Sequence, residues 1–150
     1  MKSVFDQADV KEILARIEAL TPSSRPLWGT MNVAQMLAHC NVTYELAYDN
    51  THPKPNGLVR LLLKLFVKSS VVNDKPYRHN LRTAPVFLVT DEKSFAAEKA
   101  RLVGYVNKTR ELGQRHFEQR ESHSFGPLSA TEWNRMFYKH LDHHLRQFGV

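Results

Sequence analysis

The amino-acid sequence predicts an all-α fold on three observations: apolar residues recur at helical spacing, capping motifs begin two of the helices, and strand patterns are scarce. Four long segments have the apolar period of amphipathic helices. One short apolar run, Val86–Val89, is too little to make a sheet. A chain of 150 residues with 42% hydrophobic residues can bury a core as one domain, residues 1–150. We therefore expect a helical bundle of four long helices and one shorter apolar helix.

The first two predicted helices have clear start and stop signals. Apolar residues recur every three or four positions over residues 8–20, and Pro22 lies just beyond the end of that period. The second helix begins at Asn32 and runs to Tyr48. Asn32 is followed three residues later by Gln35, which is the pattern of a capping box.

The segment 58–71 is strongly apolar and carries Arg60, Lys64 and Lys68 at intervals of four residues, which predicts a helix with one basic stripe. Such a helix could lie on a membrane surface. It could equally be a helix of the bundle whose Lys and Arg stems cover its edge. We favour the bundle helix, because the segment is short for a peripheral anchor and contains no tryptophan.

The next part of the chain alternates loops with one long helix. Residues 73–89 lack a helical period and contain two prolines, so we predict a loop there. A helix follows from Asp91 to Leu112, and Gly113 can end it. The polar residues 116–127 predict a second loop.

The last predicted helix carries an unusual group of histidines. A capping box at Ser129 begins this helix, which runs to Phe148. At about 100° per residue, His140 and His144 lie near the centre of the apolar face, whereas His143 lies toward the charged side. We therefore expect His140 and His144, but not His143, to point into the core.

Two imidazoles one helical turn apart can bind one metal ion. Their Cβ atoms lie about 5–6 Å apart, and each ring can direct a nitrogen to a zinc ion at about 2.0–2.1 Å. Burial favours the neutral imidazole that a metal requires. Eight histidines in 150 residues would produce about 0.4 such pairs by chance, so spacing alone is weak evidence. The residues leave two interpretations open: a metal-binding pair, or a core pair with satisfied hydrogen bonds.

His39 is the best candidate for a third ligand. It is the one other histidine well inside a predicted helix, and it lies at the side of that helix's apolar face. The adjacent Cys40 lies on the apolar face, where a free cysteine is usually part of the core. The remaining histidines lie in predicted loops and are expected at the surface: His52, His79, His116 and His123.

Composition limits the compartment and the partners. A single cysteine excludes a disulfide framework. The N-terminus has no secretory signal pattern, and no apolar run reaches the roughly 18 residues that span a bilayer, so we expect a cytoplasmic protein without stable membrane insertion. The net charge of +6 comes from basic residues scattered along the chain, which indicates a solvated surface rather than a nucleic-acid site.

Two histidine-bearing segments resemble the DinB-like superfamily of metal-binding helical bundles, and an uncharacterised subfamily of it in particular. They are Met31–His39 on the second helix and His140–Gln147 on the last. The resemblance extends to Pro26–Gly29 and Leu128–Trp133, and it touches most of the chain. It implies a four-helix bundle with a long crossover connection, assembled as a homodimer.

The resemblance also implies a ligand set and a class of chemistry. It implies one divalent transition metal ion, Zn or Ni, bound by His39, His140 and His144. Characterised members include thiol-dependent transferases and an isomerase, so the resemblance implies a small-molecule substrate and a low-molecular-weight thiol. The chain departs from the family pattern after the histidine pair, where Leu145–Gln147 stands in place of a glycine common in relatives.

Three functions are consistent with the sequence. A metal-dependent enzyme, a transferase or hydrolase, would use three histidines and an open coordination position. A non-enzymatic module would use the apolar segment 58–71 and the basic charge to bind an anionic or membrane partner. A structural metal site ranks lower, because such sites usually have four protein ligands. Asp142 and Glu45 are expected to face away from the histidines, so the sequence indicates no general base.

Overall fold

The protein is mostly helical and contains one small two-stranded sheet, in agreement with the predicted all-α class. The computed structural model describes residues 1–49 and 51–150. The helices are α1 (Gln7–Ala19), α2 (Val33–Tyr48), α3 (Gly57–Phe66), α4 (Lys68–Val72), α5 (Phe95–Phe117) and α6 (Ala130–Gln147), with a 3-10 turn η1 (Pro85–Phe87). The strands are β1 (Arg120–Ser122) and β2 (Gly126–Leu128), which form an antiparallel hairpin that pairs Arg120 with Leu128.

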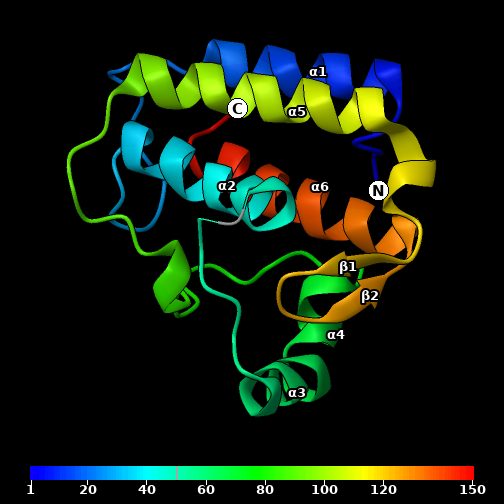
Figure 1. The fold of residues 1–150 in the computed structure, drawn as a ribbon. Helices are drawn as coiled ribbons and strands as arrows, with labels where there is room; N and C mark the ends of the chain where they lie inside the picture. Colours follow the sequence, from blue (N-terminus) through cyan, green and yellow to red (C-terminus); the bar gives the residue numbers. More distant parts are fainter. Residues whose placement is uncertain (50) are drawn as a thin grey trace.

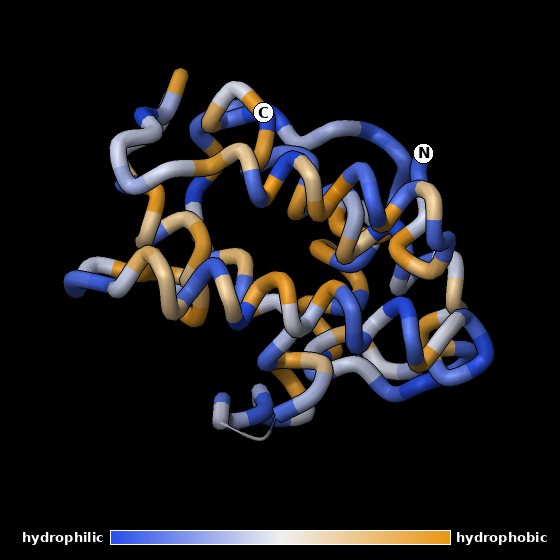
Figure 2. Tube along the Cα trace, turned by 90° about the horizontal axis from the view of Figure 1, so that it is seen from above, coloured by the Kyte–Doolittle hydropathy of each residue, from blue (hydrophilic) through white to orange (hydrophobic). Residues whose placement is uncertain are grey.

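The long helices pack around a common core. Helices α1 and α5 lie side by side, and α2 and α6 lie against α5 (Figure 1). Hydrophobic and hydrophilic residues alternate along the helical turns, as amphipathic helices require (Figure 2). The apolar side chains of the long helices meet in one cluster that includes Ile13, Leu37, Leu102 and Trp133. This core fixes α2 against α6, the two helices that carry the candidate ligands.

The caps of the two histidine-bearing helices confirm the sequence prediction. Asn32 and Gln35 form a reciprocal capping box at the start of α2. Ser129 and Glu132 do the same at the start of α6. Helix α1 begins at Gln7, and Asp6 accepts hydrogen bonds from two backbone amides as its cap.

The prediction for the segment 58–71 was wrong. The segment forms two helices rather than one, because Val67, with φ of −111°, departs from regular helical geometry. Helix α3 is not a covered helix of the bundle, since it packs mainly against α4 and none of its residues is buried. Figure 1 shows α3 on the side of the molecule away from α1 and α5. None of the helices in the described residues is both long and apolar enough to cross a membrane.

Two further predictions change around α5. Helix α5 begins at Phe95, capped by Ser94, and regular geometry breaks at Gly113 as expected, but a helical turn continues to Phe117. The segment 116–127 is therefore not a single loop, since it contains the end of α5 and most of the hairpin. Strands of three residues are too short for a period-two pattern to reveal them.

Candidate metal centre

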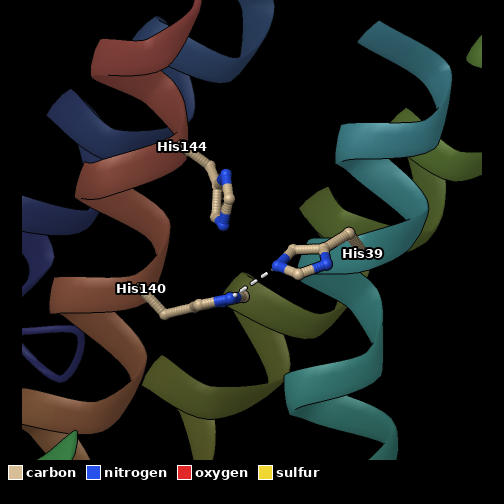
Figure 3. A group of neighbouring side chains, drawn as sticks. All are labelled: His39, His140 and His144. Atoms are coloured by element: carbon tan, nitrogen blue, oxygen red, sulfur yellow. Dashed lines mark hydrogen bonds between the residues drawn. The ribbon is translucent and has the colours of Figure 1, made fainter. Parts of the chain in front are cut away.

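Helices α2 and α6 place three histidines opposite one another. His39 projects from the middle of α2, and His140 and His144 project from successive turns of α6 toward it (Figure 3). The sequence-predicted trio is therefore brought together, from parts of the chain about 100 residues apart. His39 and His144 are buried, and His140 is partly buried.

The ring nitrogens are close enough to share one ion. One nitrogen from each of His39, His140 and His144 lies within 4.8 Å of the other two. The Nε2 atoms of His39 and His140 lie 3.0 Å apart. A tetrahedral site with zinc–nitrogen bonds of about 2.0–2.1 Å separates its ligands by about 3.4 Å. That separation falls between the 3.0 Å of the His39–His140 pair and the 4.8 Å upper limit for the group.

Each of the three rings has its Nδ1 atom held by a neighbouring oxygen. Metal-binding histidines in proteins commonly use the second ring nitrogen in this way, because the contact fixes the ring orientation. With Nδ1 occupied, the nitrogen left for an ion is Nε2 in every case. The contacts are His39 Nδ1 with Phe87 O at 2.8 Å, His140 Nδ1 with Thr43 Oγ1 at 3.0 Å, and His144 Nδ1 with Gln147 Oε1 at 2.8 Å.

Two of these contacts also fix the tautomer. A backbone carbonyl only accepts, so His39 Nδ1 must donate its proton to Phe87, and His39 Nε2 carries the lone pair. The Gln147 amide donates from its Nε2 to the Trp28 carbonyl at 2.7 Å, which leaves Gln147 Oε1 to accept from His144. His144 Nε2 therefore also carries a lone pair directed at the cluster.

His140 can adopt either tautomer without losing a partner. Its Nδ1 faces the Thr43 hydroxyl, which both donates and accepts. Without a metal ion, His140 Nε2 donates to His39 Nε2 and its Nδ1 accepts from Thr43. With a metal ion, the proton would reside on Nδ1 and the Thr43 oxygen would accept it. Because the Thr43 hydroxyl pairs with Nδ1 in both tautomers, His140 can change tautomer at a small cost in free energy.

Burial keeps the three imidazoles neutral. Desolvation, together with the nearby His39 ring, lowers the pKa of His144 to about 3. Desolvation likewise lowers the pKa of His140 well below its ordinary value of 6.5. The pKa of His39 is also lowered by burial, although its hydrogen bond to Phe87 opposes the shift. All three rings are in the form that binds metal ions at neutral pH.

The triad lies at the wall of a cavity of about 620 Å³. The wall is mostly apolar, and the Trp28 ring, stacked on His79 at a centroid distance of 3.8 Å, forms part of it. Arg78 and Arg82 are its charged residues, and no carboxylate lines it in the part of the chain that the structure describes. The cavity has the volume and lining of a small-molecule site.

The residues that sequence analysis excluded as ligands lie outside the triad. His143 is half-buried, and its ring lies beside that of His144 at 5.0 Å without belonging to the cluster. Cys40 is buried in the core, where desolvation raises the pKa of its thiol. Asp142 pairs with Arg16 at 2.8 Å, as expected for a side chain that faces away from the triad.

The other histidines only partly match their predicted surface loops. His116 lies inside α5 rather than in a loop, and it is exposed. His79 is exposed in a turn, as predicted, whereas His123 is half-buried and lines the cavity. His52 contacts Glu45 at 2.7 Å, and Glu45 also pairs with Arg101, so Glu45 is directed away from the triad.

Sequence reasoning missed the residues that hold the rings. Thr43 follows His39 by four positions and Gln147 follows His144 by three, so helical spacing could have identified both. Gly29 could not be found in this way. Its φ of +80° suits glycine, and a Cβ there would lie 2.6 Å from Gln147 Nε2, so glycine permits the close approach of that amide.

Fold and site together define a helical protein with a three-histidine cluster that could hold a metal ion. The chain belongs to the family described as "Protein of unknown function (DUF1569)", whose model matches residues 2–149. No curated protein and no solved structure matches the chain. The site itself must therefore carry the functional argument.

Proposed function

We propose that this protein binds one divalent transition metal ion through the Nε2 atoms of His39, His140 and His144. The observation that carries the proposal is that the two nitrogens of each ring have different surroundings. In each ring Nδ1 contacts an oxygen, and Nε2 faces the other two rings (Figure 3). A core pair of histidines with satisfied hydrogen bonds would not need a third ring, nor lone pairs directed at a common point.

Three imidazoles suit zinc, nickel, iron or copper, of which we propose zinc or nickel, and they leave a coordination position for another molecule. A metal ion in such a site supplies Lewis-acid chemistry. The protein's own residues supply the neutral rings, their fixed orientation and the apolar surroundings. Closed structural zinc sites use four ligands, and the fourth nearby group expected of one is lacking among the described residues.

The cavity beside the triad supports a metal-dependent enzyme that acts on a small molecule. Its volume of about 620 Å³ suits a substrate of metabolite size, and its aromatic wall suits an apolar part of that substrate. Arg78 and Arg82 favour a neutral or anionic substrate over a cation. These features are compatible with a transferase, and a low-molecular-weight thiol is the co-substrate that we propose to test first.

We further propose that the architecture is a DinB-like four-helix bundle. Helices α1, α2, α5 and α6 would form the bundle, and residues 51–94, which contain α3, α4 and η1, would form its long crossover connection. The histidine positions on α2 and α6 support this assignment. A homodimer is part of the same proposal.

Metal analysis of untagged protein tests the metal site. After chelation and reconstitution with zinc or nickel, we expect one equivalent per chain, and His140→Ala should weaken binding on the order of 100-fold or more. His116→Ala is the matched control, because His116 is exposed on α5 and should leave affinity unchanged. Circular dichroism establishes that the variants are folded. Retention of less than about a tenth of an equivalent by the wild type would refute the metal site.

A further inference from the structure

Helix α3 presents an apolar surface that nothing in the described chain covers. Its exposed residues reach 76% exposure at Phe66, 69% at Leu58 and 63% at Leu65, although apolar side chains of this size are usually buried. Scattered exposed apolar residues are ordinary, but six exposed apolar residues on one ten-residue helix form a contiguous patch. The patch consists of Leu58, Val59, Leu61, Leu62, Leu65 and Phe66.

The patch lies beside a basic stripe on the same helix. At about 100° per residue, the six exposed residues cover an arc of roughly 160°, and Arg60 and Lys64 lie on the adjoining arc. Lys68, at the start of α4, continues this stripe. Leu63, which is half-buried, points to the rest of the molecule. The helix contains no acidic residue, so its outer surface combines exposed apolar groups with positive charge.

The surrounding segment carries the entire net charge of the protein. Residues 51–82 contain seven Lys or Arg residues and one acidic residue, Asp74, which makes a net charge of +6. The remaining 14 basic residues are balanced by 14 acidic residues. Within the described chain, two of the seven basic side chains have ion-pair partners: Arg60 pairs with Glu121, and Lys68 pairs with Glu132. The other five are exposed: Lys54, Lys64, Lys75, Arg78 and Arg82.

We propose that α3 docks on the surface of an anionic lipid bilayer, with its six exposed apolar residues in the interface and the exposed Lys54, Lys64 and Lys75 among the headgroups. Amphipathic helices with this combination lie in the plane of the interface. Each nearby Lys or Arg adds attraction to anionic lipid. A second copy of the chain is a poorer occupant, because it would bring two segments of +6 together. Nucleic acid would satisfy the charge but leave the leucines exposed.

Co-sedimentation of the full chain with vesicles tests the docking helix. We expect binding to vesicles with about 30% phosphatidylserine at low salt, little binding to pure phosphatidylcholine, and release at about 0.5 M salt. Leu65→Glu should weaken partitioning at least about tenfold, and Lys64→Gln about fivefold. The matched controls are Leu112→Glu on α5 and Lys11→Gln on α1, which should bind like the wild type.

Two outcomes would overturn the docking proposal. One is absence of binding to anionic vesicles at low salt. The other is a dimer in gel filtration that Leu65→Glu converts to a monomer while vesicle binding is absent, which would assign the patch to a second copy. Because Leu65 is 63% exposed, Leu65→Glu should remain folded, and its thermal unfolding establishes that directly. The result is independent of the metal site, since α3 carries none of the three histidines.

Discussion

The histidine triad and helix α3 both depart from the usual rule that polar residues are exposed and apolar residues are buried, but in opposite directions. The triad buries polar imidazoles on apolar helix faces, whereas α3 exposes leucines to solvent. In the triad, each Nδ1 has an oxygen partner, so the cost of burying the ring is offset inside the chain. On α3, six apolar residues remain exposed among the described residues. The comparison teaches that the buried imidazoles find their Nδ1 partners within the chain, whereas the exposed apolar patch of α3 finds no cover among the described residues.

The sharpest test of this comparison is the stability cost of the same substitution in the two regions. Leu37 is fully buried in α2 and Leu65 is 63% exposed on α3. We expect Leu37→Ala to lower the free energy of unfolding by about 3 kcal/mol, because it leaves a cavity in the core. Leu65→Ala should change it by less than about 0.5 kcal/mol. Urea denaturation of both variants measures the difference, and equal effects would mean that α3 is covered in solution.

Acidification should destabilise the metal-free protein through its triad. The folded-state pKa of His144 is about 3, below the ordinary 6.5, so the unfolded chain binds more protons than the folded chain between these pH values. The free energy of unfolding therefore decreases as the pH is lowered from 6.5 toward 3. His144 alone contributes a loss on the order of 2 kcal/mol between pH 6.5 and 5. Denaturation of chelator-treated protein at these two pH values measures it. His144→Gln should flatten the dependence, and an identical slope in that variant would contradict the assignment.

The smallest effect concerns the residue that orients His144. Gln147→Leu removes the oxygen that holds His144 Nδ1 but leaves all three ligands in place. We expect a loss of zinc affinity of about 10-fold to 100-fold, since partners of this kind contribute that much at known sites. Arg146→Gln is the control, because the Arg146 side chain is 69% exposed and does not contact the triad. Unchanged affinity in Gln147→Leu would mean that the contact does not orient the ring.

The sequence was most informative where the determining signals are local. Apolar periods and capping boxes predicted α2 and α6, and the same period directed His140 and His144 to the core while it set His143 aside. Their meeting with His39 depended on how two helices about 100 residues apart in the chain pack. The helix position of His39 made it a candidate, and the resemblance implied the full set of three.

The remainder required tertiary information. The contact between Gly29 and Gln147 joins two ends of the chain, and no local pattern encodes it. The exposure of α3 depends on which elements pack against it. An apolar period is the same whether or not another element covers the helix, so the sequence pattern does not distinguish the two cases. The concentration of charge in residues 51–82 was present in the sequence, but a search for short basic runs did not detect it.

X-ray absorption spectroscopy of the zinc-loaded protein tests the central claim most directly, because it reports the ligands of the ion itself. If the Nε2 atoms of His39, His140 and His144 bind the ion, the first shell contains nitrogen or oxygen at about 2.0–2.1 Å, with outer-shell scattering from three imidazoles. A sulfur shell at about 2.3 Å, or scattering from fewer than two imidazoles, would contradict the account.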